Sequence, residues 1–184
     1  RNAAVGRAIL LGDGSPEARR AARDRFLRRL SISAYQALLF NRWLAERMAD
    51  GIFATAIAGD VLKKLDTGGL FNCAAPAADG PRVERFEISP AGPMFGHKLR
   101  AAEGEALLRE ERLLAAEGIE LSDFARGGGE AEGTRRAARL RVEVALAPLE
   151  DGYLATFELP KGSYATVVMR ELMKAGAELP EDED

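Results

Sequence analysis

One stretch near the C-terminal end decides the fold, Phe157-Glu158-Leu159-Pro160-Lys161-Gly162-Ser163-Tyr164-Ala165-Thr166-Val167-Val168-Met169-Arg170-Glu171-Leu172. Its first residues predict a strand, because the apolar Phe157 and Leu159 alternate with Glu158. Pro160 ends that strand, since it has no N–H to donate to a neighbouring strand. The residues after Pro160 must therefore form a turn or another kind of element.

The second part of the stretch predicts a sharp turn into a helix. Gly162 permits the turn, and Ser163 is placed to cap a helix that ends before Gly176. Such a corner leaves backbone N–H groups free beside Lys161, an arrangement that suits an anionic ligand. An ordinary strand-to-helix corner without any ligand is the alternative.

The same sixteen residues resemble the C-terminal signature of the tRNA pseudouridine synthase D (TruD) family, F-x-L-P-x-G-S-[YF]-A-T-x-x-x-R-E-L. Three further blocks resemble that family in the same order: LSISAYQALLFN at residues 30–41, Gly59-Asp60, and GPMFG at residues 92–96. The resemblance extends over nearly the whole chain.

The resemblance implies an α+β fold, with a mostly helical domain inserted into a pseudouridine-synthase sheet. On that template, residues 1–14 are a lead-in from the catalytic domain and residues 15–133 form the inserted TRUD domain. Residues 134–177 return to the catalytic domain as a β-hairpin and a helix. Residues 178–184 carry five acids and no base, and we expect them to be a disordered acidic tail.

The implied activity is isomerisation of uridine 13 in tRNA to pseudouridine, without cofactor or metal. The target base must leave its stack, because its reacting atoms are inaccessible in a paired duplex. The family's nucleophilic Asp belongs to a G-x-K-D-x-x-A motif, which is followed by N-x-F-G-x-Q-R-F-G, and neither occurs here. We therefore expect that Asp upstream of Arg1, on a missing N-terminal half, and expect this chain alone to be catalytically inert.

The resemblance also carries over the support of the active site. The matching positions, expected beside the active-site cleft, are Gly162, Ser163, Tyr164, Ala165, Thr166, Arg170 and Glu171.

Charge is unevenly distributed. The net charge is −3, but outside the acidic tail 26 basic side chains face 24 acidic ones. Residues 1–30 hold eight arginines and three acids. We therefore expect a mildly basic body with a cationic N-terminal end.

The basic residues lie on a predicted helix. Ser15-Pro16-Glu17 is a strong helix start, and the helix is predicted to reach about Arg29, after an irregular lead-in over residues 1–14. Its arginines mostly avoid the apolar face, so they form either a solvated surface or a site for tRNA phosphates. The candidates for RNA binding are Arg19, Arg23, Arg28 and Lys161.

Further elements are predicted from local patterns. A capping box at residues 33–36 opens a buried helix that reaches about Met48, with an intrahelical Arg42–Glu46 pair. Residues 66–69 predict a hairpin turn, residues 92–96 a rigid turn, and residues 103–117 a helix.

The last third of the chain contains a glycine-rich run. Residues 125–133 predict either a mobile loop or a domain boundary. Residues 134–139 could form a capped turn. Residues 140–146 and 153–159 alternate with a period of two and form a predicted hairpin around Asp151-Gly152, which needs further strands to be stable.

Several classes of site are absent from the pattern. Cys73 is the only cysteine and His97 the only histidine, which excludes an intrachain disulfide and a thiolate metal site. Without a membrane-length apolar run, we expect a cytoplasmic protein. Two other functions stay open: a catalytically inactive tRNA-binding module, and a helical interaction domain without any role in RNA binding.

Overall fold

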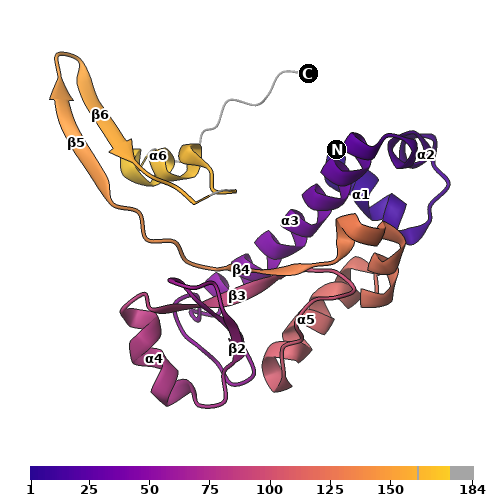
Figure 1. Cartoon of the computed structure of the whole chain (residues 1–184), viewed down its shortest axis with the longest axis horizontal. Helices are drawn as coiled ribbons and strands as arrows, with labels where there is room; N and C mark the ends of the chain where they lie inside the picture. The colour runs from indigo at the N-terminus through magenta and orange to yellow at the C-terminus, as the bar shows by residue number, and fades with distance from the viewer. Residues whose placement is uncertain (161, 175–184) are drawn as a thin grey trace. The chain divides into compact units, whose positions relative to one another are not determined.

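The computed structural model describes residues 1–160 and 162–174 and divides into two compact units (Figure 1). Unit 1 comprises residues Arg1–Leu140, and unit 2 begins at Arg141. Each unit has its own antiparallel sheet. The expected α+β class is confirmed. The units differ from the expected domain limits, because residues 1–14 and 134–140 belong to unit 1.

Unit 1 begins with a helix, α1 (Asn2–Leu11). The prediction of an irregular lead-in was wrong, because α1 packs along the long helix α3 (Arg25–Ala49) and buries Leu10. Gly12 ends α1 in the left-handed conformation at φ 71°. The apolar residues of the lead-in are thus part of the core.

The next helix, α2 (Pro16–Arg23), is shorter than predicted. It starts as expected, with the Ser15 side chain accepting a hydrogen bond from the N–H of Ala18. It ends early because Asp24 starts α3: its Oδ1 accepts a hydrogen bond of 3.0 Å from the N–H of Leu27. Ser33 therefore lies inside α3, and the capping box predicted there was wrong.

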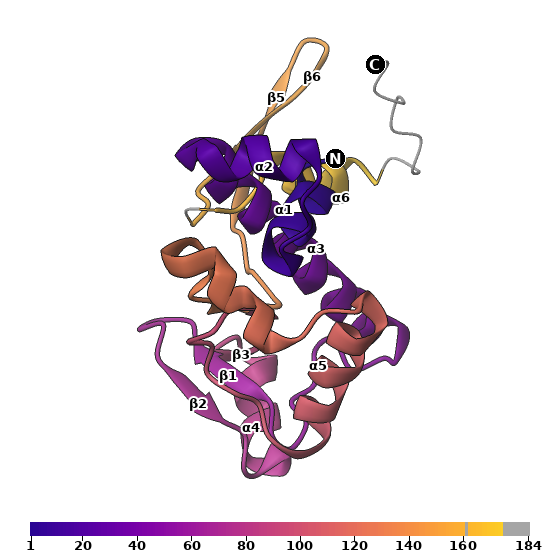
Figure 2. The same ribbon diagram turned by 90° about the vertical axis from the view of Figure 1, so that its right-hand side faces the viewer.

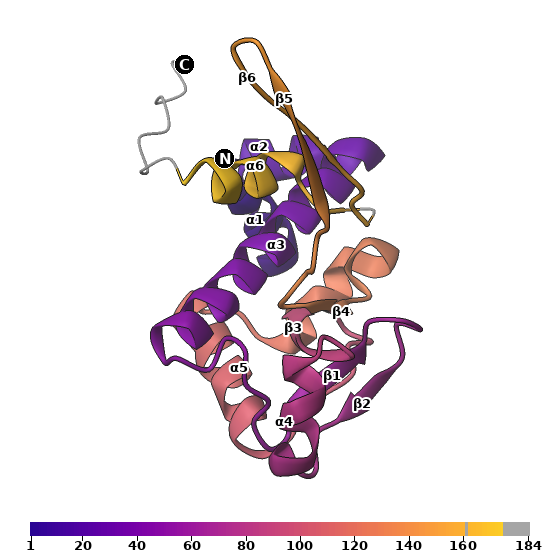
Figure 3. The same ribbon diagram turned by 90° about the vertical axis from the view of Figure 1, so that its left-hand side faces the viewer.

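The sheet of unit 1 has the strand order β2-β1-β3-β4. The strands are β1 (Val61–Lys64), β2 (Leu70–Asn72), β3 (Ile88–Met94) and β4 (Thr134–Ala137). The predicted hairpin at residues 66–69 is confirmed by the pairing of β1 with β2. A helix that was not predicted, α4 (Pro76–Glu84), packs against β3 (Figure 3). The capped turn considered for residues 134–139 is instead the edge strand β4.

The predicted rigid turn at residues 92–96 was wrong, because its first three residues belong to β3, and all seven residues of that strand are buried. The strand passes directly over α3. An added Cβ at Gly92 would lie 2.4 Å from a ring carbon of Trp43. Glycine therefore serves close packing here, not a turn.

Helix α5 (Gly104–Glu117) matches its prediction and ends at Gly118. The glycine-rich run does not form a mobile loop or a boundary. Most of it belongs to the 3-10 segment η1 (Leu121–Ala131), in which Gly127 and Ala131 are buried. An added Cβ at Gly127 would lie 3.2 Å from Leu10 of α1. Small residues allow η1 to approach the helices closely.

The core of unit 1 joins α1, α3, β3, α5 and η1. Side chains from segments far apart in sequence meet there, as Figure 2 also shows for the ribbons. The largest of the fully buried apolar side chains are Tyr35, Phe95, Phe124, Leu10, Ile32 and Leu39. The prediction that α3 is the buried centre of its domain is confirmed, although Met48 is exposed.

Unit 2 contains the predicted hairpin and helix. Strands β5 (Val144–Leu149) and β6 (Gly152–Phe157) pair as a two-stranded sheet, and the pair Leu149–Gly152 closes the turn. β5 starts later than the predicted residue 140. Helix α6 (Ala165–Met173) follows.

Candidate functional site

A basic face lies on α2 and the first turn of α3. Ala18 and Ala21 are buried, so the arginines of α2 are directed away from the packed side. We use the term basic face for five exposed residues: Arg19, Arg20, Arg23, Arg25 and Arg29. Figures 1 and 2 show α1, α2 and the start of α3 together at the end of unit 1 remote from its sheet.

The guanidinium groups of the basic face are unpaired in the part of the chain that the structure describes. Within residues 1–160 and 162–174, none of its five guanidinium groups has an acidic partner or a side-chain hydrogen bond. Of the two acids in this region, Asp24 caps α3, and Glu17 lies in the first turn of α2 without an ion pair among the described residues. Unpaired guanidinium groups on one surface are suited to phosphate oxygens, which accept charge-assisted hydrogen bonds.

The other two sequence candidates for RNA binding differ from this group. Arg28 is half-buried, and its Nη2 donates a hydrogen bond of 2.8 Å to the carbonyl oxygen of Arg126. It therefore contributes to packing between α3 and η1. Lys161 lies outside the described residues.

The corner before α6 has the positive backbone angle that its sequence suggests. Gly162 has φ 90°, and the N–H of Ser163 donates to the carbonyl oxygen of Pro160 over 3.1 Å. The prediction that Ser163 caps the helix was wrong, because Tyr164 occupies the cap position and makes no side-chain cap hydrogen bond. Lys174, in the left-handed conformation, ends α6 before Gly176.

The remaining corner candidates lie on exposed positions. Tyr164 is 72% exposed, and no residue of α6 is buried. Thr166 and Arg170 are four residues apart and therefore share one helix face. Ala165 and Glu171 are exposed on the same helix. The corner and the basic face belong to different units.

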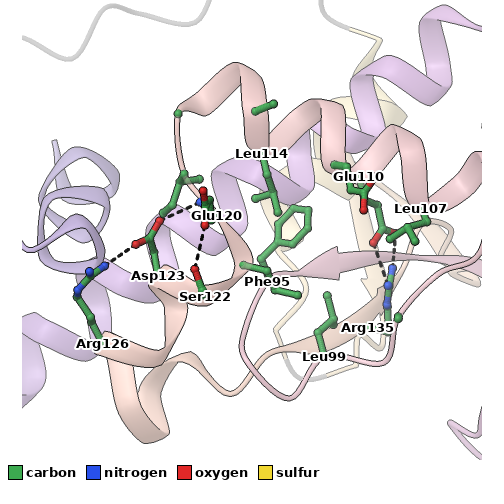
Figure 4. A pocket seen from close by; sticks show the side chains of 16 residues that line it. Phe95, Leu99, Leu107, Glu110, Leu114, Glu120, Ser122, Asp123, Arg126 and Arg135 are labelled. Carbon is green, nitrogen blue, oxygen red and sulfur yellow. Dashed lines mark hydrogen bonds and ion pairs between the residues drawn. The ribbon is translucent and has the colours of Figure 1, made fainter.

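A groove of about 840 Å³ lies between α5, η1 and the segment after β3 (Figure 4). Phe95, Leu99 and Leu114 lie at its centre. No local pattern in the sequence indicated it, because its lining comes from three separate segments. Its walls also carry Glu110, Glu111, Glu120, Asp123, Arg126 and Arg135.

The charged groups of the groove are largely paired with one another. At one end Arg135 binds both carboxylate oxygens of Glu110, at 2.5 and 3.0 Å. At the other end Arg126 pairs with Asp123. The N–H of Glu120 donates to Asp123 and, with Arg126, lowers the pKa of that carboxyl. Because the remaining charge is mainly acidic, the groove does not suit a phosphate.

The buried acids of unit 1 are also held by arginines. Arg47 binds Asp60 through two hydrogen bonds of 2.9 and 3.0 Å, and the N–H of Ile57 donates to the same carboxylate. Burial raises the pKa of Asp60, while Arg47 acts in the opposite direction. The ion pairs Arg47–Asp60 and Arg135–Glu110 were not predicted. Asp60 has no free oxygen directed at a ligand, so it is poorly suited to act as a nucleophile.

The predicted intrahelical pair of Arg42 with Glu46 was wrong. Arg42 pairs instead with Glu117 of α5, because the two helices pack against each other.

No helix in the described part of the chain is both long and apolar enough to span a membrane.

Comparisons with known proteins agree on one family. The model of the family tRNA pseudouridine synthase D (TruD) matches residues 14–172. Among curated relatives, the tRNA pseudouridine synthase D of Anaeromyxobacter sp. (strain Fw109-5) is 93% identical over 185 residues, covering 100% of this chain and 53% of that protein. That of Thermus thermophilus is 40% identical over 171 residues, covering 90% and 43%.

The fold agrees as well. A crystal structure of a protein assigned as tRNA pseudouridine synthase D from Methanosarcina mazei matches with a TM-score of 0.71 and 22% identity. The match covers 95% of this chain and 57% of that one. The chain spans about half the length of the curated relatives it matches.

Proposed function

Because the chain belongs to the tRNA pseudouridine synthase D (TruD) family, we propose that the complete protein isomerises uridine 13 of tRNA to pseudouridine in the cytoplasm. The observation that carries the proposal is the family match over residues 14–172, which includes both units. This chain then supplies RNA binding and part of the active-site wall. No cofactor is required for the proposed chemistry.

The nucleophile in this proposal is an Asp upstream of Arg1, in the family's G-x-K-D-x-x-A motif. Two features of the chain support this. Its sequence contains no such motif. Three acids are buried among the described residues, and each is paired with an arginine. Asp60 and Glu110 have both oxygens bound, and Asp79 pairs with Arg82 through one oxygen.

We propose that the corner of unit 2 borders the active-site cleft. Its candidates are Gly162, Ser163, Tyr164, Ala165, Thr166, Arg170 and Glu171. Their largely exposed positions support the assignment, because an exposed corner is available to a substrate or to further strands of the complete protein. The two strands β5 and β6 likewise expose Leu146, Leu149 and Leu154, which further strands would cover.

The basic face is proposed to bind the phosphates of tRNA. Its arginines have no acidic partner in the described part of the chain, so phosphate binding does not require an existing ion pair to break. Each phosphate contact should contribute about one unit to the slope of log affinity against log salt. Such contacts position the RNA without selecting a base.

Charge reversal tests this role. Arg19→Glu with Arg23→Glu in the complete protein should weaken tRNA binding at low salt and reduce the salt slope by about two units. The control is Arg85→Glu on unit 1, where Arg85 is exposed and pairs with Glu87. Equal affinity of the two variants would mean that the basic face is only a solvated surface.

Pseudouridine formation separates the main proposal from its alternative. A catalytically inactive tRNA-binding module would bind tRNA with the same salt dependence but form no pseudouridine. A helical interaction domain would not bind tRNA at all.

A further inference from the structure

The start of α3 presents an aromatic ring to solvent. Phe26 is 72% exposed, although burial of a phenylalanine side chain stabilises a folded protein. One turn further on, Leu30 is 40% exposed. The ring of Phe26 does not belong to any of the buried hydrophobic clusters of the described residues.

Helix geometry explains this exposure. The buried residues Ile32, Tyr35 and Leu39 define the inner side of α3. At 100° per residue, Phe26 and Leu30 lie on roughly the opposite side. The ring is therefore directed outward by the register of the helix, and not by a fraying end, since Asp24 caps the first turn.

The surroundings of the ring are cationic. Arg25 precedes Phe26, and Arg29 lies one turn away on a neighbouring part of the helix surface. Arg19, Arg20 and Arg23 on α2 extend the same charge. A second copy of this chain would bring like charges together, so the surface disfavours self-association. A polyanion with flat apolar groups is complementary both to the positive charge of the arginines and to the aromatic ring of Phe26.

We propose that Phe26 stacks on an unpaired base of the tRNA, while the basic face holds the adjoining phosphates. This inference rests on the proposed function. Alternation of charge and aromatic faces is how proteins bind unpaired nucleotides, and stacking tolerates any base because every base has a π face. Phe26 thus requires a loop or an end of the RNA, whereas the arginines also bind a duplex.

Salt dependence distinguishes the two kinds of contact. Phe26→Ala in the complete protein should weaken tRNA binding by about tenfold or more and leave the salt slope unchanged. Arg29→Gln should reduce the slope. Phe26→Trp should retain the affinity, and its fluorescence should be quenched by a short single-stranded RNA and much less by a duplex of the same length.

Matched controls exclude a loss of structure. Met48→Ala removes an apolar side chain that is 59% exposed on the same helix, about 33 Å along its axis, and should not change binding. Neither alanine variant should lower the melting temperature, because both side chains are exposed. The wild-type protein is assayed in parallel for pseudouridine formation. Its fluorescence gives the background signal in the absence of the tryptophan introduced at position 26.

Each outcome has one meaning. If the wild type binds and modifies tRNA but Phe26→Ala binds equally well, the stacking contact is wrong and the proposed function stands. If the wild type does not bind tRNA, both are wrong. If Phe26→Ala binds tRNA normally but changes the oligomeric state in solution, Phe26 is a protein contact and the inference is overturned.

Discussion

Arg135 of β4 and Glu110 of α5 form a buried ion pair through two hydrogen bonds of 2.5 and 3.0 Å. Arg135 also donates to the carbonyl oxygen of Arg100 and to that of Ala91 on β3. The edge strand, the sheet and α5 are thereby tied together at one residue. Arg135 is 2% exposed, so its guanidinium has no access to water as a substitute partner.

Removal of one member of this pair should be strongly destabilising. Arg135→Met leaves the carboxylate of Glu110 buried without its cation, which costs about 3–5 kcal/mol. Unfolding by urea measures the loss. A double variant, Arg135→Met with Glu110→Met, should recover much of it, because both buried charges are then absent.

The loss of stability caused by Arg135→Met should also depend on pH. Burial raises the pKa of Glu110, while Arg135 opposes that shift in the wild type. Without Arg135 the pKa rises further. The stability of a folded state with a raised carboxyl pKa is present at low pH and lost as pH rises through that pKa. Arg135→Met should therefore be less destabilised at pH 5 than at pH 8, and an equal loss at both would contradict the role assigned to Arg135.

Packing at Gly92 gives a second prediction. Gly92→Ala places a methyl group 2.4 Å from Trp43 and 2.8 Å from Phe40, and should cost about 1–3 kcal/mol. Gly80→Ala is the control, because no atom lies within 4 Å of an added Cβ there and the residue is within α4. In thermal unfolding, the melting temperature of the Gly80→Ala control should equal or exceed that of the wild type. A stable Gly92→Ala would mean that β3 and α3 are not in close contact.

Cys73 should be chemically inert in the folded protein. Burial, together with its hydrogen bond to Asp79, raises the pKa of the thiol to about 11. At pH 8 only about one thiol in a thousand is then the reactive thiolate. Mass spectrometry after treatment with iodoacetamide should find Cys73 unmodified in the native protein and alkylated in urea. Rapid native labelling would contradict the buried position.

The corner of unit 2 supplies a prediction about activity. Gly162 has φ 90°, so Gly162→Val in the complete protein introduces backbone strain of about 1–2 kcal/mol although the space around it is open. Asn tolerates positive φ better and is the matched control. In the Gly162→Val variant, the rate of pseudouridine formation should fall by a larger factor than thermal stability does. The Asn variant should lose less activity than the Val variant. Full turnover by Gly162→Val would exclude this corner from the active site.

The sequence indicated the elements whose signals are local. The caps at Ser15 and Gly118 and the hairpin at Asp151-Gly152 were each readable from a few neighbouring residues. The errors occurred where distant residues decide. Gly92 and Gly127 suggested turns or loops, but both allow close contact with partners from other segments. The burial of Arg47 and Arg135 was not predicted, because each pairs with an acid from another segment of the chain.

The candidate site divides in the same way. The arginine-rich run of α2 was visible as composition, but only the structure separates the exposed Arg19 and Arg23 from the half-buried Arg28. The exposure of Phe26 was not predicted. The side of α3 on which Phe26 lies, relative to the buried residues, follows only once the start of the helix is known. Asp24 fixes that start, and the sequence offered a competing cap at Ser33.

The most direct test compares pseudouridine formation at position 13 of tRNA by the purified 184-residue chain and by the complete protein. We expect turnover by the complete protein and none by the chain alone, because the proposed nucleophile lies upstream of Arg1. An Asp→Asn change in the upstream G-x-K-D-x-x-A motif should abolish turnover while tRNA binding persists. Turnover by the isolated chain would contradict the proposed function, since a carboxylate within it would then have to be the nucleophile.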